Sequence, residues 1–205
     1  MMLRTRLEAE LVELSDEELL FRARNGNEPA FNHLYERHRD SVFRFAYRLT
    51  SSTRTSEDIT QDCFLSLFRS GERFEGTRAS LRTYLLAAAR NLAFKRFGKA
   101  SLETDLEAIE SEPAASESGP LDNLLQSELE DVVRAAIESL PPLQREALVL
   151  FEYEEIALAQ IAQVVGADVG TVKARLHRAR QRLKQLLAPY YMRGAGERTA
   201  DEVLR

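Results

Sequence analysis

Apolar residues recur at intervals of three and four along most of the chain, the spacing that places them on one face of an α-helix. No stretch keeps the strict apolar–polar alternation of a half-buried β-strand. The pattern therefore predicts an all-α protein. Its helical stripes cover residues 15–25, 29–49, 56–68, 81–92, 124–140, 143–153, 156–165 and 170–187.

Local signals mark where the first helices begin and end. Ser15, followed three residues later by Glu18, is typical of a capping box that opens a helix. Asn25 and Gly26 are suited to its end, because both residue types tolerate the left-handed backbone of a C-terminal cap. Pro29 then fits the first turn of the next helix.

The last two stripes predict a helix-turn-helix. Gly166 is expected to end the first helix in a left-handed conformation, and Asp168 to cap the second. Apolar residues of the second helix recur on one face, so its opposite face is free to meet a partner; that face carries Ala174, His177, Arg178 and Gln181. Between residues 169 and 196 there are seven Lys or Arg and no Asp or Glu. This favours insertion into a DNA major groove over the competing interpretation, a merely solvated basic helix.

Charge is strongly segregated along the chain of 205 residues, whose formal net charge is −5. Residues 101–131 hold ten acids and no Lys or Arg, whereas residues 69–99 hold eight bases and two acids. The acidic stretch has few large apolar groups and contains Pro113, Gly119 and Pro120, so we expect a flexible linker. The net charge therefore conceals two basic modules on either side of an acidic connector.

The sequence thus predicts two small helical domains joined by an acidic flexible linker, the C-terminal one with a helix-turn-helix. The expected boundaries are an N-terminal extension (1–13), a first domain (14–98), the linker (99–123), a second domain (124–190) and a loose C-terminal tail (191–205).

Several classes of protein fit the sequence poorly. Cys63 is alone, which excludes an internal disulfide, and it lies in an apolar stripe; we expect a small buried hydrophobe, with a redox sensor as the alternative. The three His and one Cys lack metal-ligand spacing, so no metal or cofactor is expected. No window approaches the ~18 apolar residues of a membrane span, and residues 1–10 do not resemble a signal peptide. We therefore expect a cytoplasmic protein without membrane insertion.

The order of motifs resembles one bacterial family. Residues 139–150 (SLPPLQREALVL) and 166–180 (GADVGTVKARLHRAR) are similar to the C-terminal domain of sigma factors of the extracytoplasmic-function kind. LYERH at 34–38, EDITQDCF at 57–64 and the run from RFEG at 73–76 to ARNL at 89–92 resemble that family's second conserved region, in order and spacing. The resemblance covers about residues 14–187, linker included.

The resemblance implies a transcription initiation factor that binds core RNA polymerase, reads two promoter elements and helps to open the duplex. Four polar residues share one helical face opposite Ile59 and Cys63, and the matching family segment binds the clamp helices of polymerase; they are Glu57, Asp58, Gln61 and Asp62. A merely solvated acidic face is the competing interpretation.

For promoter DNA, the resemblance assigns two sets of residues. Those matching the capture of single-stranded non-template bases and phosphates at the minus 10 element are Phe74, Arg82, Arg90, Asn91 and Lys95, with Arg96 as a further phosphate-binding base. Those matching recognition of duplex DNA at the minus 35 element are Lys173, Ala174, Arg175, His177 and Arg178. Arg178 is suited to guanine, a pairing worth about 1–3 kcal/mol of discrimination.

The sequence departs from the family pattern at a few positions. Thr55 stands where an acid is usual, and phosphorylation of Thr55 or Thr53 would restore the negative charge. Glu155 and Ala157 replace the usual Gly and Ser or Thr before the helix-turn-helix. We therefore expect residues 148–165 to form a more continuous helix than is typical.

Two other classes of function compete with that of a sigma factor. The main alternative is a conventional helix-turn-helix regulator that acts on duplex DNA without polymerase. An enzyme is disfavoured, because His33, His38 and Cys63 lack the spacing of a nucleophilic or metal site, so no catalytic residue is expected. The resemblance also implies an anti-sigma partner, which no residue of the sequence identifies.

Overall fold

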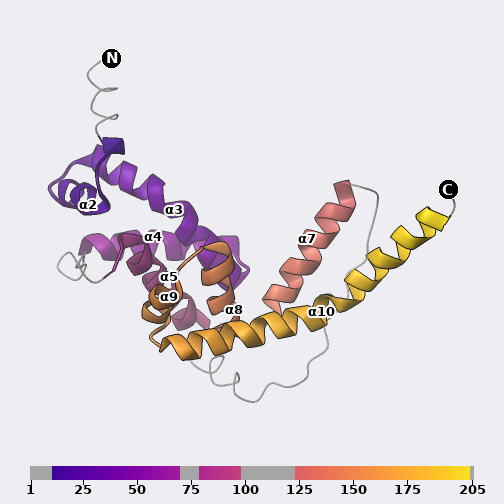
Figure 1. Ribbon diagram of the computed structural model, residues 1–205. Coiled ribbons are helices and arrows are strands. Elements are labelled where there is room, and N and C mark those ends of the chain that lie inside the picture. The colour runs from indigo at the N-terminus through magenta and orange to yellow at the C-terminus, as the bar shows by residue number, and fades with distance from the viewer. Residues whose placement is uncertain (1–10, 70–78, 98–122, 204–205) are drawn as a thin grey trace.

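The computed structural model describes residues 11–69, 79–97 and 123–203, and within these ranges every regular element is helical, as the sequence predicts (Figure 1). The N-terminal half contains α2 (Asp16–Arg24), α3 (Glu28–Thr50), α4 (Thr53–Arg69) and α5 (Leu81–Phe97). The C-terminal half contains α7 (Asn123–Glu138), α8 (Pro142–Leu148), the π-helical turn η2 (Val149–Tyr153), α9 (Leu158–Val165) and α10 (Val169–Val203). The predicted linker lies outside the described residues except for Asn123, which begins α7.

Side chains cap both of the first two helices, the first at Ser15 as the sequence predicts and the second at Asn27, which was not predicted from the sequence. The Ser15 hydroxyl accepts a hydrogen bond from the Glu18 backbone N–H at 3.2 Å and so caps α2. After α2 the chain turns through Gly26, whose φ of +85° requires a residue without Cβ strain. Asn27 then caps α3 by accepting from the Ala30 N–H at 2.9 Å. These local interactions set the register of the two helices on which the first domain is built.

A partly buried ion-pair cluster joins α2 to α3. Asp16 accepts a hydrogen bond from Arg37 at 2.9 Å, and its other oxygen lies 2.8 Å from Nε2 of the buried His38. Burial raises the pKa of Asp16, but the hydrogen bonds and positive charges of His38 and Arg37 outweigh it, so the pKa lies below its usual value. The cluster therefore stabilises the fold above pH 4, and its contribution disappears as the pH falls through the lowered pKa.

The helix-turn-helix forms as the sequence predicts. Gly166 ends α9 with φ at +65°, and the Asp168 carboxylate accepts a hydrogen bond from the Thr171 N–H at 2.9 Å, which caps α10. The Thr171 hydroxyl also donates to Asp168, and these hydrogen bonds lower the pKa of Asp168. The Gly166 turn and the Asp168 cap therefore define where α9 ends and where α10 begins.

The expectation of a continuous helix over residues 148–165 is wrong. The chain widens into η2, where the Glu154 N–H donates to the Val149 carbonyl at 3.1 Å, and it leaves the helix at Glu155. Glu155 itself has φ at +52°, a left-handed conformation that costs a non-glycine residue free energy. The helix therefore breaks where the family usually has Gly, although Glu155 occupies the position.

Helix α10 continues through Val203, so most of the segment expected as a C-terminal tail is helical. Figure 1 shows this yellow end of α10 extending away from the rest of the molecule. Its earlier turns pack against α8 and α9. No helix in the described ranges is both long enough and apolar enough to cross a lipid bilayer.

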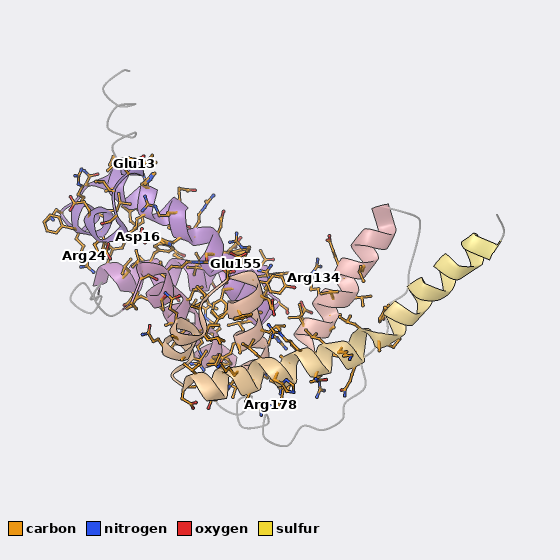
Figure 2. The ribbon with its side chains drawn as sticks, viewed as in Figure 1. Glu13, Asp16, Arg24, Arg134, Glu155 and Arg178 are labelled. Carbon is orange, nitrogen blue, oxygen red and sulfur yellow. The ribbon has the colours of Figure 1, made fainter. Side chains whose placement is uncertain are left out.

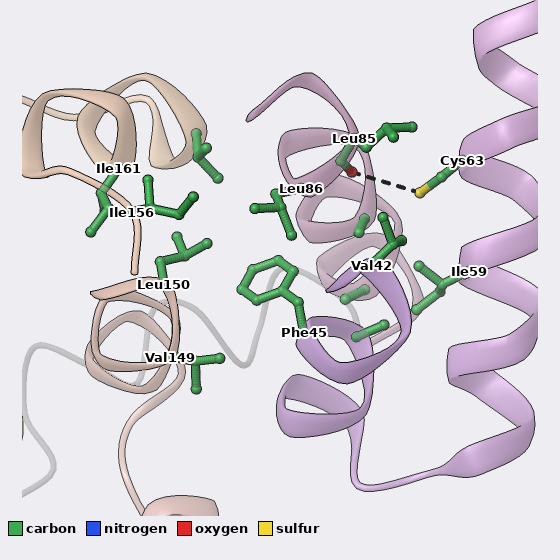
Figure 3. Close-up of a cluster of buried hydrophobic side chains, with 14 of the residues drawn as sticks. Val42, Phe45, Ile59, Cys63, Leu85, Leu86, Val149, Leu150, Ile156 and Ile161 are labelled. Carbon is green, nitrogen blue, oxygen red and sulfur yellow. Dashed lines mark hydrogen bonds between the residues drawn. The ribbon is translucent and has the colours of Figure 1, made fainter. Parts of the chain in front are cut away.

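The two halves share one hydrophobic core. Helix α5 packs against α9, and α3 packs against α8 and η2. Phe45 and Leu86 of the first half point toward Leu150 and Ile156 of the second, as Figure 3 shows, and all four are buried. Each such side chain contributes about 1.5–3 kcal/mol by leaving water. The halves are therefore held together by apolar contact as well as by the chain that connects them.

Candidate nucleic-acid interface

The first turns of α10 present the predicted DNA-facing side chains. Ala174, His177 and Arg178 are exposed, as is Lys173, whereas the alternate face is buried against α8 and α9. The buried residues are Val172, Leu176 and Ala179. Figure 2 shows Arg178 on the side of α10 that is turned away from α8. The structure therefore brings together on one accessible surface the face that helical periodicity predicts.

Arg175 differs from the other predicted residues of α10. Its Nη1 donates to the Oε1 atom of Glu146 in α8 at 3.1 Å, and its side chain is only 15% exposed. Glu146 is completely buried. Arg175 is thus held against the protein interior, although it lies between two exposed members of the predicted surface.

Helix α5 carries the predicted minus 10 residues other than Phe74, and two of them are held by glutamates of the other half. Arg90 Nε donates to Glu146 Oε2 at 2.6 Å, so Glu146 joins Arg90 to Arg175. Arg82 Nη2 donates to Glu154 Oε2 at 2.8 Å. Charge-assisted bonds of this length are among the strongest hydrogen bonds in proteins.

The environment of Glu154 extends into α3. The Ser41 hydroxyl donates to Glu154 Oε2 at 2.6 Å and accepts from Arg82 Nε at 3.1 Å. Arg44 Nε lies 4.0 Å from the other Glu154 oxygen. Glu154 is completely buried, so three groups of the first half surround a carboxylate that the second half supplies.

The remaining minus 10 candidates do not contact the buried glutamates. Asn91 and Lys95 are exposed on α5, and Asn91 Oδ1 accepts a hydrogen bond from Arg90 at 3.5 Å. Phe74 lies outside the described residues. The structure therefore places one exposed pair and one covered pair of candidate residues along α5.

Sequence reasoning missed Glu146 and Glu154. The burial of Glu146 could have been predicted, because it lies three residues after Leu143 and four before Leu150, on the apolar stripe of its own helix. The burial of Glu154 could not, because the π-helical turn η2 changes which face the following residue occupies. An acid on an apolar stripe indicates a buried partner, and the partner here comes from the other half.

The predicted polymerase-binding residues share one exposed face of α4, namely Glu57, Asp58, Gln61 and Asp62. Arg96 lies against that face rather than at a free surface: its Nη2 donates to Asp62 at 3.2 Å, and its Nη1 lies 3.7 Å from Asp58 and donates to the Thr55 carbonyl at 3.1 Å. An open pocket of about 420 Å³ adjoins Glu57 and Gln61, and aromatic rings of α3 and α4 line it. The surface thus combines negative charge with apolar area.

Cys63 is a buried thiol on the opposite side of α4. Its Sγ lies 3.9 Å from the Leu85 carbonyl, and burial, aided by the charge of Asp62, raises its pKa to about 12. A thiol with so high a pKa holds its proton at neutral pH and is a poor nucleophile. The structure therefore favours the structural interpretation of Cys63 over the redox one. Within the described ranges, no group of three His, Cys, Asp or Glu has metal-binding geometry.

Comparison with known proteins matches both halves to one family. The family model for Sigma-70 region 2 matches residues 34–102, and that for Sigma-70, region 4, matches residues 130–183. The ECF RNA polymerase sigma-E factor of Escherichia coli K12 is 31% identical over 190 residues, which cover 88% of this chain and 98% of the relative. The ECF RNA polymerase sigma factor SigE of Mycolicibacterium smegmatis is 33% identical over 165 residues, 79% of this chain but only 63% of that relative's length.

A solved structure agrees with these matches. The sigma factor RpoE of Bartonella quintana, solved in complex with the anti-sigma factor NepR, is 27% identical with a TM-score of 0.54. The similarity covers 73% of this chain and 91% of that one. The chain described here belongs to the extracytoplasmic-function family of bacterial RNA polymerase sigma factors.

Proposed function

We propose that this protein is a sigma factor that binds core RNA polymerase in the cytoplasm, recognises minus 35 and minus 10 promoter elements and promotes DNA melting. The observation that carries the proposal is the exposed surface on the first turns of α10, whose start is defined by the Gly166 turn and the Asp168 cap. It occurs in a chain whose other half matches the family's polymerase-binding region.

At the minus 35 element, α10 enters the major groove by its N-terminal turns. Arg178 is suited to a bidentate contact with guanine, and His177 lies beside it to reach a neighbouring base edge. Ala174 offers only a methyl group, which suits contact with thymine. Lys173 and Arg175 bind phosphates, which adds affinity and salt dependence rather than sequence choice.

At the minus 10 element, α5 binds the single-stranded non-template DNA. Asn91 has both a donor and an acceptor for a base edge and is exposed. Arg82, Arg90 and Lys95 bind phosphates, and Phe74 stacks on a captured base. Binding single-stranded DNA more tightly than the duplex shifts the equilibrium toward the open promoter.

Core polymerase binds the exposed acidic face of α4. Its carboxylates and the adjoining aromatic pocket are complementary to a helical surface that carries both positive charge and apolar residues. An anti-sigma factor is the second protein partner that we assign to this chain, by analogy with the complex of Bartonella quintana RpoE and NepR.

The test is reconstituted transcription. The purified chain, added to core polymerase, should direct initiation from a distinct set of promoters. The substitution Glu57→Lys reverses a charge on the α4 face and should weaken core binding by at least tenfold, whereas Glu17→Lys makes the same change at an exposed position of α2 and should not. Duplex binding by the chain alone, with no transcription from active core, would instead identify a conventional regulator.

A further inference from the structure

Two completely buried glutamates of the C-terminal half form hydrogen-bonded ion pairs with arginines of the N-terminal half. Glu146 receives hydrogen bonds from Arg90 of α5 and from Arg175 of α10, and Glu154 receives them from Arg82 and Ser41. Three of these four partners are arginines that the proposed function assigns to DNA. The same atoms therefore cannot bind a phosphate while these contacts persist.

A carboxylate and a phosphate bind arginine through the same hydrogen-bonding geometry. Both present oxygens to the planar fork of guanidinium N–H groups, and Arg90 uses two of these groups on Glu146, at 2.6 and 3.3 Å. Acids are buried only when they are paired, so each glutamate depends on its arginines in this arrangement. When the halves separate, Arg82 and Arg90 of α5 become available to DNA, while Glu146 keeps Arg175 of its own half and water solvates Glu154.

The apolar contact between the halves opposes this separation. Leu86 and Phe45 face Leu150 and Ile156 across the interface that Figure 3 shows, and separation would expose them to water. Arg48 also stacks on Tyr153 from the other half, with its guanidinium carbon 4.1 Å from the ring centre. In a chain with no partner, the hydrophobic effect therefore favours contact between the halves.

A neighbouring glutamate shows that the pairing is specific. Glu152 lies in η2, between Glu146 and Glu154 in sequence, but it pairs with Arg180 of its own half at 2.6 Å and stays 44% exposed. Glu155 is exposed as well. Only the two buried acids of this segment reach the arginines of α5.

We propose that the free chain holds a closed form, in which Glu146 and Glu154 act as internal substitutes for promoter phosphates on Arg90 and Arg82 of the minus 10 surface until DNA and polymerase displace them. The inference rests on the proposed function only in assigning Arg82 and Arg90 to DNA. The competing ligand is single-stranded DNA, which binds by its phosphates to the arginines that the glutamates release.

The first measurement is the distance between the halves. Fluorophores are attached at Glu17→Cys on α2 and Gln181→Cys on α10, both exposed positions, while the native Cys63 is buried. The labelled chain with the native glutamates should show a single transfer efficiency. Combining Glu146→Gln with Glu154→Gln should change that efficiency. The matched control combines Glu152→Gln with Glu155→Gln, which removes equal charge from the same segment and should leave the transfer unchanged.

The second measurement is binding of a single-stranded oligonucleotide that carries the minus 10 sequence, without polymerase. The Glu146→Gln/Glu154→Gln chain should bind at least tenfold more tightly than the wild type or the control. Saturating oligonucleotide should also change the energy transfer of the labelled wild-type chain, a readout that needs no variant to fold. Equal affinities with unchanged transfer would overturn the proposal. If the energy-transfer results show a closed form but the chain supports no transcription with core polymerase, the proposed function is wrong and the closed form is still supported.

Discussion

The two helices that we assign to promoter DNA, α5 and α10, present their basic side chains in opposite ways. On α10, His177 and Arg178 are exposed and point away from α8. On α5, Arg82 and Arg90 are bound to carboxylates that the other half of the molecule supplies. The base-reading side chains assigned to the minus 35 element are therefore exposed, whereas two arginines assigned to the minus 10 element are bound to glutamates.

This difference shows that the residue types on a helix do not determine whether their side chains are free to bind DNA. Both helices carry arginines at helical spacing, and neither sequence pattern distinguishes a free guanidinium from an occupied one. Occupation depends on how distant elements pack: Glu146 of α8 and Glu154, which follows η2, reach arginines of α5, whereas His177 and Arg178 of α10 stay exposed. Duplex recognition by α10 can thus precede single-strand capture by α5.

The largest expected effect concerns Cys63, which reports whether opening also disturbs α4 and α5 themselves. Its pKa of about 12 should leave the native thiol about a thousandfold less ionised near pH 8 than an unfolded thiol with a pKa of about 8.5. Stability due to this thiol is present below pH 8.5 and falls as the pH rises toward 12, because only the unfolded state ionises there. Reaction with an aromatic disulfide measures the protection.

The same protection should survive in the Glu146→Gln/Glu154→Gln chain, because separation of the halves leaves Cys63 between α4 and α5. The chain unfolded in urea provides the fully reactive reference. Rapid labelling of Cys63 in the folded variant would mean that the packing of α4 against α5 is also disturbed. The two glutamates would then not simply uncover an intact α5.

The parts of this arrangement that depend on neighbouring residues could be predicted from the sequence, and the parts that depend on distant ones could not. Ser15, Gly166 and Asp168 act within four residues of themselves, so their roles as caps and turn follow from residue type. Glu146 and Arg90 are 56 positions apart, and their pairing depends on how the halves meet. The left-handed backbone of Glu155 likewise reflects packing around η2 rather than its own preference.

A second prediction tests the open surface against the covered one in the free chain. Arg178→Ala should weaken binding to a minus 35 duplex about 5- to 150-fold, because a bidentate arginine contact is worth about 1–3 kcal/mol. Arg90→Lys keeps a charge opposite Glu146 and should leave duplex affinity unchanged, while it lowers transcription once polymerase is added. Fluorescence anisotropy measures the first effect. Equal losses of duplex affinity in both variants would abolish the distinction between the two helices.

The smallest expected effect concerns the helix that covers α5. Ala157 precedes α9 in an extended conformation but provides no side-chain cap, in contrast to Asp168 before α10. Ala157→Ser should therefore raise the free energy of unfolding by about 1 kcal/mol, measured by urea denaturation. Ala188→Ser, an exposed substitution within α10, should instead lower it slightly. Because α9 packs on α5 and not on the exposed face of α10, the added stability should favour the closed form without changing duplex affinity; a change in duplex affinity would show that the two surfaces are coupled.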